Sequence, residues 1–139
     1  MESIAEGGYI IVEDFAYESA DEKTLGWFAS SIGLLEATGS LIASDGSLQA
    51  VLSKTETLKA WRQNHEIELH TAAEIDAQLE KVFGRVIREN AAYYFRYIAN
   101  DITPAGKRDA ILQAFAGQEE TLAADGCIVP LGRRFTAVS

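Results

Sequence analysis

The chain of 139 residues contains a single cysteine, Cys127, and this scarcity excludes several kinds of site. One thiol forms no disulfide within the chain and supplies no cysteine-based metal cluster. Because the sequence has no disulfide framework, we expect a reducing, cytoplasmic localisation. We expect Cys127 itself to be a small core residue, since no histidine pairs with it to activate a thiol nucleophile.

Long apolar runs, targeting segments and basic residues are also scarce. No apolar stretch approaches the roughly 18 residues that a membrane span needs, and no basic segment followed by an apolar one opens the chain. There are 12 basic against 21 acidic residues, for a net charge of −9. Because the apolar runs are short, we expect no membrane span. Because so acidic a surface repels phosphate backbones, we expect no nucleic-acid partner.

The motifs of several common binding sites are missing. There is no phosphate-binding loop, no G-x-S-x-G, and no third glycine after Gly7 and Gly8 to open a helix as a dinucleotide fingerprint does. The histidines His65 and His70 lie five residues apart, whereas a zinc-protease helix has them at i and i+4. A spacing of five turns the two rings away from each other on a helix or a strand. We therefore expect no metal site.

What the chain does contain is the composition of one globular domain. Hydrophobic residues make up 47% and charged residues 24% of it. Residues 9–12 are continuously apolar, which is typical of a strand covered on both faces in a parallel sheet. The alternative is an edge strand at the start of the domain.

Helices are expected where capping signals precede apolar residues at helical spacing. The capping-box spacing occurs at residues 19–22, 53–56 and 71–74. The first and third precede amphipathic stretches that Gly39 and Gly84 can end. Residues 53–56 indicate either a new helix or the continuation of one that starts near Ser47. We also expect helices over residues 91–99 and from Pro104 to Asp125-Gly126.

Short strands are expected at residues 86–87, 127–129 and 135–138, with a bend or bulge at 131–133. The predicted fold is α/β and helix-rich with a small mixed sheet, in a single domain over residues 1–139. Its first strand should be parallel to at least one neighbour, and its last strands antiparallel at an edge of the sheet.

The order of several segments resembles the C-terminal half of class I S-adenosylmethionine-dependent methyltransferases. The segments are residues 8–17 (GYIIVEDFAY), in which Gly8 is the second glycine of a pair, residues 21–28, a later helical stretch, and residues 132–138 at the end. In that family a glycine pair precedes the fifth strand, and an acidic, aromatic segment follows it. The helical stretch, with Trp61, His65 and His70, resembles the family's helical cap.

The resemblance implies a Rossmann-like fold of which this chain holds only the substrate-side half with its helical cap. The family's glycine-rich cofactor loop and the acid that ends its second strand have no counterpart here. S-adenosylmethionine is therefore implied as a cofactor by resemblance alone, and we expect it not to bind the isolated chain. The implied function is a methyltransferase portion that is inactive alone.

The implied substrate site lies after the first strand and in the cap. Ligands of open α/β sheets bind beyond the carboxyl ends of strands, and a carboxylate there can act as a base. The candidate bases are Asp14 and His70. The candidate substrate-binding residues, for a small-molecule substrate, are Glu13, Asp14, Phe15, Tyr17, Trp27, Trp61, His70 and Tyr94.

Two other functions stay open. The chain can be a non-catalytic oligomeric interaction or regulatory module, or an unrelated, mostly helical binding protein with no parallel sheet containing residues 9–12. Since an open apolar strand edge invites pairing with another chain, we expect a homo-oligomer or a companion chain to bind through residues 8–14.

Overall fold

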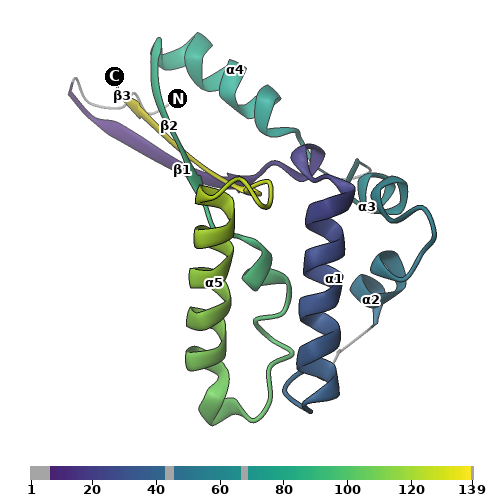
Figure 1. Cartoon of the computed structure of the whole chain (residues 1–139). Helices are drawn as coiled ribbons and strands as arrows, with labels where there is room; N and C mark the ends of the chain where they lie inside the picture. Colours follow the sequence, from purple (N-terminus) through teal and green to yellow (C-terminus); the bar gives the residue numbers. More distant parts are fainter. Residues whose placement is uncertain (1–6, 43–45, 67–68, 139) are drawn as a thin grey trace.

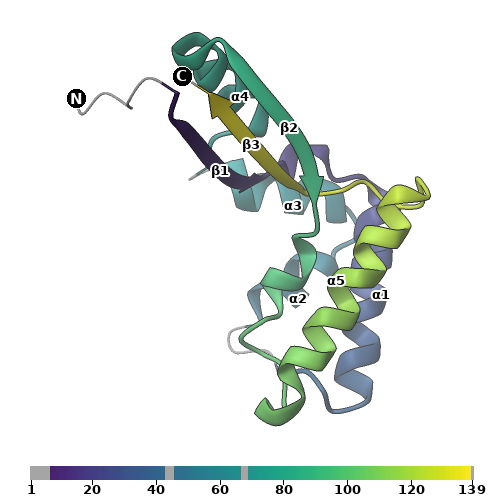
Figure 2. The same ribbon diagram turned by 90° about the vertical axis from the view of Figure 1, so that its left-hand side faces the viewer.

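A computed structural model describes residues 7–42, 46–66 and 69–138 (Figure 1). Its strands and helices follow in the order β1 (Tyr9–Phe15), η1 (Tyr17–Ser19), α1 (Glu22–Ala37), α2 (Ser47–Leu52), α3 (Thr57–Glu66), α4 (Ala72–Phe83), β2 (Arg85–Ala91), η2 (Tyr94–Tyr97), η3 (Ala105–Lys107), α5 (Arg108–Ala124) and β3 (Gly132–Val138). The strands and α4 form one end of the molecule, while α1, α2 and α5 form the other (Figure 2). The mixture of helices and a small sheet confirms the α/β class.

The three strands form one sheet in the order β1-β3-β2, and both pairings are antiparallel. The prediction that β1 has a parallel neighbour is therefore wrong for the described strands. The last strand is antiparallel as expected, but it lies in the middle of the sheet and not at an edge. Because both neighbours oppose β3, β1 and β2 run in the same direction and their carboxyl ends lie together.

One face of the sheet is covered and the other is not. Phe135 on β3, with Val12 and Val86 on its neighbours, packs against Ile75 and Leu79 of α4. The opposite face carries Tyr9, Ile11 and Glu13 of β1, Arg134, Thr136 and Val138 of β3, and Arg85, Ile87 and Glu89 of β2. We call these nine residues the open face, because no described α-helix packs on it (Figure 1). Arg96 of η2 reaches its inner end, 3.4 Å from the carboxylate of Glu13.

Residues 9–12 are therefore not buried on both faces as predicted. Tyr9 is 69% and Ile11 is 52% exposed, while Ile10 and Val12, which alternate with them, are half-buried. Side chains alternate across a strand, and α4 covers only one of the two faces. The alternative prediction, an edge strand, agrees with the observed position of β1.

One of the three capping signals is confirmed by the structure. Thr71 accepts the backbone N–H of Glu74, whose carboxylate accepts the N–H of Thr71, so this capping box is confirmed. The first helix begins later than predicted, because Asp21 and not Ser19 accepts a first-turn N–H, that of Thr24. At residues 53–56 the chain leaves α2, and α3 is a new helix.

Three predicted elements are wrong. Residues 91–99 form the end of β2 and the short η2, because the Glu119 carboxylate accepts the N–H groups of Tyr93 and Tyr94. Residues 127–129 form no strand, since the N–H groups of Cys127 and Ile128 bond back to the Leu122 carbonyl at the end of α5. Residues 131–133 are no bend, because β3 begins at Gly132.

Other positions need smaller corrections. Cys127 is exposed and is not the core residue we expected. Pro104 precedes η3 in an extended conformation, so α5 begins only at Arg108. The main core lies among the helices and includes Leu25, Phe28, Trp61, Tyr94 and Phe115. Among the described residues, no helix has the length and apolarity to cross a membrane.

Candidate functional site

Aromatic side chains gather where the carboxyl ends of β1 and β2 meet. Phe15 is the last residue of β1, and Tyr93 follows two residues after β2. Their rings stack at 4.6 Å with 20° between their planes. The gathered residues are Phe15, Tyr17, Trp61, His65, Tyr93 and Tyr97, which we call the aromatic cluster. Phe15, Tyr93 and Tyr97 are half-buried, so the cluster reaches the surface.

His65 lies at the centre of the aromatic cluster and is held by two hydrogen bonds. Its Nδ1 is 2.7 Å from the carbonyl oxygen of Trp61, one turn earlier on α3, and its Nε2 is 2.9 Å from the Tyr97 hydroxyl. A carbonyl only accepts, so Nδ1 carries the proton and Nε2 accepts from Tyr97. Burial lowers the pKa of His65, which keeps the ring neutral at physiological pH.

The other members hold η1 and α3 together around His65. The Tyr17 ring stacks on the His65 ring with 5.5 Å between centroids. The Trp61 indole N–H donates to the Tyr17 carbonyl over 3.1 Å, which ties η1 to α3. Trp61 and Tyr17 are both buried, so they position the cluster more than they offer surface to a ligand.

Two predicted site residues, Trp27 and Tyr94, lie behind the cluster in the helical core. Their rings meet edge to face at 5.7 Å, and Trp27 also packs against Phe115 of α5. Tyr94 is fully buried, and burial strongly raises the pKa of its hydroxyl. The Tyr94 and Trp61 rings lie 6.2 Å apart, so the core supports the aromatic cluster from within.

The two acidic candidates point to different faces of the sheet. Glu13 lies on the open face and accepts from Arg134 at 2.7 Å and from Arg96 at 3.4 Å. These two guanidinium groups, Arg134 foremost, lower the pKa of Glu13. The Asp14 carboxylate accepts the backbone N–H of Phe15 at 2.8 Å. Each carboxylate is thus held by a partner within the chain.

His70, the other candidate base, is not brought to the aromatic cluster. Its side chain is 86% exposed and lies 3.7 Å from the carboxylate of Glu74 on α4. His65 takes the central place instead, although we did not include it among the site residues. The spacing of Trp61 and His65 on one face of a helix was the signal that could have identified it. Among the described residues no cluster of metal-ligating side chains occurs; residues 67–68, between the histidines, lie outside that set.

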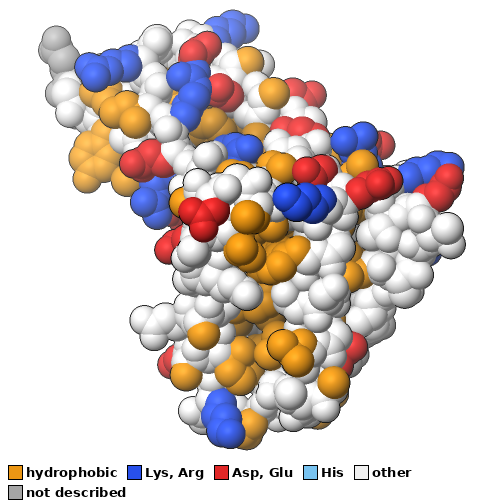
Figure 3. Space-filling model, viewed as in Figure 1, with side chains coloured by type: hydrophobic (Ala, Val, Ile, Leu, Met, Phe, Trp, Pro, Cys, Tyr) orange, Lys and Arg blue, Asp and Glu red, His pale blue; other side chains and the backbone are white. Residues whose placement is uncertain are grey.

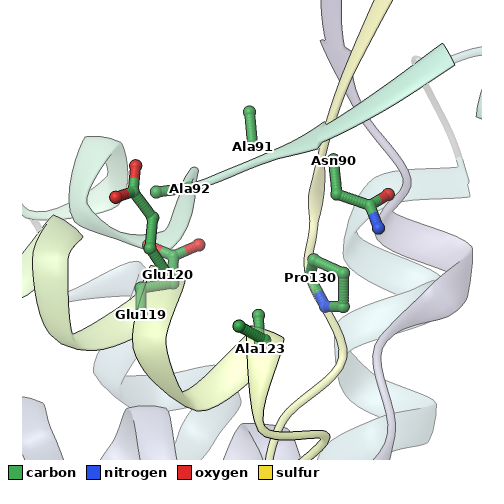
Figure 4. Close-up of a pocket in the computed structure, with 8 residues that line it drawn as sticks. Asn90, Ala91, Ala92, Glu119, Glu120, Ala123 and Pro130 are labelled. Atoms are coloured by element: carbon green, nitrogen blue, oxygen red, sulfur yellow. The ribbon is translucent and has the colours of Figure 1, made fainter.

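A separate cavity of about 280 Å³ lies between the end of β2, the last turns of α5 and Pro130 (Figure 4). It is lined mainly by small apolar side chains, those of Ala91, Ala92, Ala123, Ala124 and Pro130, with Asn90, Glu119 and Glu120. Glu119 connects it to the cluster, since its carboxylate accepts the N–H of Tyr93 at 2.6 Å. None of the predicted substrate-binding residues lines this cavity.

No protein-family model, no curated protein and no solved structure matches the chain. The functional argument therefore depends on the residues themselves. The geometry brings Phe15, Tyr17 and Trp61 together as predicted and adds His65, Tyr93 and Tyr97. The flat, half-buried rings of Phe15, Tyr93 and Tyr97 are suited to holding an apolar or planar molecule. Both ring nitrogens of His65 are already bonded within the chain, so His65 positions the cluster.

Proposed function

We propose that this chain is the substrate-side half of an S-adenosylmethionine-dependent methyltransferase fold, inactive alone and completed by a cofactor-binding half. The observation that carries the proposal is the convergence of the aromatic cluster at the carboxyl ends of β1 and β2. In open α/β sheets, ligands bind outside the carboxyl ends of strands. Three residues that the family resemblance implied for the substrate site, Phe15, Tyr17 and Trp61, lie in this cluster.

The unfinished sheet supports the same proposal. β1 pairs with β3 on one side, and no described strand pairs with its other edge. Doubly wound sheets carry helices on both faces, whereas among the described helices only α4 covers a face of this sheet. A companion half that adds a strand to the free edge of β1 would extend the sheet toward such a fold.

The backbone of β1 is ready to pair with an added strand. Ala16 N–H bonds to the Leu131 carbonyl across the sheet, so the even-numbered residues of β1 face β3. The backbone groups of Tyr9, Ile11 and Glu13 therefore face the free edge. The antiparallel pairing of β1 with β3 is equally expected of the alternative, an unrelated binding protein. The methyltransferase half requires a parallel strand, supplied by its companion, at the free edge of β1, and the unrelated binding protein does not.

The residues at the strand ends do not fit the cofactor itself. β1 is followed by the short η1, and β2 by Ala92 and Tyr93, with no glycine-rich turn into a helix at either place. We therefore assign no step of the reaction to S-adenosylmethionine here. The chain's own residues orient an acceptor molecule and exclude water from it, which is the main requirement of a transfer reaction that depends on positioning.

Calorimetric titration with S-adenosylmethionine tests the proposal. The isolated chain should give no heat of binding, and a fusion behind the cofactor-binding half of a class I methyltransferase should bind. The matched control is the same fusion carrying Ile11→Pro, which removes one N–H from the free edge of β1 and should abolish the gain. Binding by the isolated chain as a monomer would overturn the proposal.

The second candidate is a non-catalytic interaction module, which the apolar side chains on the open face favour. Such a module should form a stable oligomer, and the fusion should bind no S-adenosylmethionine. The two measurements together therefore separate the candidates.

A further inference from the structure

The open face carries more exposed apolar surface than the rest of the sheet. Ile87 is 46% and Val138 is 36% exposed, and they accompany Tyr9 and Ile11 on the same face. Hydrophobic side chains gather over the outer end of the sheet, at the upper left of Figure 3. Contiguous apolar surface of this kind marks an interaction site.

The strand register arranges the open face in three rows across the sheet. The outer row is Tyr9, Val138 and Arg85; the middle row is Ile11, Thr136 and Ile87; the inner row is Glu13, Arg134 and Glu89. The middle row carries no charge. On β2, a positive residue in the outer row and a negative residue in the inner row lie on either side of Ile87.

We infer that the open face binds a second copy of this chain, sheet against sheet, around a two-fold axis that crosses the strands at Thr136. This rotation places each middle-row side chain opposite its own counterpart, so Ile11 meets Ile11 and Ile87 meets Ile87. It places the outer row of one copy over the inner row of the other. Arg85 of each copy then faces Glu89 of its partner, so the two-fold axis gives two equivalent ion pairs.

At the remaining positions, Tyr9 faces Glu13 and Val138 faces Arg134 of the second copy. The other possible two-fold axis, along β3, would place Glu13 opposite Glu89 and Arg134 opposite Arg134. Like charges that face each other destabilise an interface, so the charges select the first arrangement.

The shape of the molecule also agrees with it. The helical end lies beyond the inner end of the sheet, while the start of β1 and the end of β3 lie at the outer end (Figures 1 and 2). Reversing one sheet over the other places the two helical ends at opposite ends of the dimer. Stacked in the same direction, the two helical ends would lie side by side.

The dimer should be weak, because the face is small. Three strands of seven residues give a face of roughly 24 by 14 Å from ordinary strand spacings. Specific interfaces of standard size bury about 800 Å² per partner. We therefore expect a monomer–dimer equilibrium that depends on protein concentration at physiological ionic strength.

The deciding experiment exchanges the charges of Arg85 and Glu89. Sedimentation velocity over a concentration series measures the dissociation constant of the dimer. Arg85→Glu and Glu89→Arg should each raise the dissociation constant roughly tenfold. The double variant should restore it, because the two ion pairs re-form with their signs exchanged. A mixture of wild type and double variant should contain homodimers and no heterodimer.

Two further variants test the apolar part of the face. Ile11→Glu should abolish the dimer, whereas Val82→Glu should leave it unchanged, because Val82 is an exposed side chain on α4. Circular dichroism verifies that each variant is folded. A wild-type chain that stays monomeric at high concentration, or a double charge variant that does not regain association, would overturn the inference. Sedimentation measures association of the isolated chain, and titration measures cofactor binding by the fusion, so failure of the dimer and failure of the methyltransferase proposal are seen in different experiments.

Discussion

The Nε2 atom of His65 accepts a hydrogen bond from the Tyr97 hydroxyl over 2.9 Å, although 32 residues separate them in the chain. The pair joins α3 to η2 inside the aromatic cluster. It also fixes one tautomer, since the Nδ1 proton is committed to the Trp61 carbonyl. The contact therefore links two distant segments of the chain within the aromatic cluster.

Replacing Tyr97 with phenylalanine should destabilise the protein. The change leaves the buried Nε2 of His65 without a donor, which costs about 1–3 kcal/mol of unfolding free energy. Urea unfolding at pH 7.5 measures it. Tyr9→Phe is the matched control, because it removes an exposed hydroxyl and should change the unfolding free energy by less than about 0.5 kcal/mol. Equal effects of the two variants would contradict the role of the pair.

Acidification should weaken the fold through His65. Burial lowers the pKa of His65 in the folded state below its ordinary value of about 6.5. The unfolded chain therefore binds the proton more readily, and the stabilisation present above pH 6.5 is lost as the pH falls through the folded pKa. Between pH 7 and pH 5 the contribution of His65 to the unfolding free energy should decline, while Glu119 contributes in the opposite direction.

His65→Gln should make that decline shallower over the same pH range, because it removes the titrating group. The control is His70→Gln, whose side chain is exposed and should leave the slope unchanged. A slope that stays the same in His65→Gln would assign the pH dependence to other groups.

Glu119 should be essential as an acceptor and dispensable as a charge. It is 1% exposed, and its Oε1 accepts the N–H groups of Tyr93 and Tyr94. Glu119→Ala leaves two buried donors without partners and should cost about 2–4 kcal/mol of unfolding free energy. Glu119→Gln keeps an acceptor oxygen and should cost much less, and exposed Glu120→Ala should have little effect.

The pH dependence of the Glu119 variants should have the opposite sign to that of His65. Burial raises the pKa of Glu119, so its contribution is present at low pH and is lost as the pH rises through the folded pKa. Glu119→Gln should therefore gain stability relative to the wild type between pH 4.5 and pH 7. A constant difference between the two proteins across this range would refute the raised pKa.

Gly132 should tolerate no side chain. A Cβ atom at this position would lie 2.5 Å from the backbone carbonyl oxygen of Ala91, its partner on β2. Gly132→Ala must separate β3 from β2 and should cost about 1–3 kcal/mol of unfolding free energy. Gly33→Ala, in an open position on α1, should instead stabilise the helix by about 0.5–1 kcal/mol. Thermal unfolding compares the two, and stabilisation by both would contradict the close approach.

The sequence determined the features that depend on neighbouring residues. The Thr71–Glu74 capping box, the glycine that ends α4 and the strand nature of residues 9–12 all follow from local hydrogen bonding and apolar pattern. It also named Phe15, Tyr17 and Trp61 as candidate substrate-binding residues; the structure brings them together, and their role in binding stays a prediction.

Only the tertiary structure decided the features that depend on distant partners. Glu119, 25 residues away or more, accepts the N–H groups of residues 93 and 94. The stretch predicted as a helix over residues 91–99 therefore contains only the short 3-10 helix η2. β1 lies at an edge because β3, from the other end of the chain, pairs with both β1 and β2. His65 was placed in the site, and His70 outside it, by contacts with Tyr17 and Tyr97 that no local pattern encodes. Long-range pairing fixes which face of a strand or helix is covered, and that decides which residues form the site.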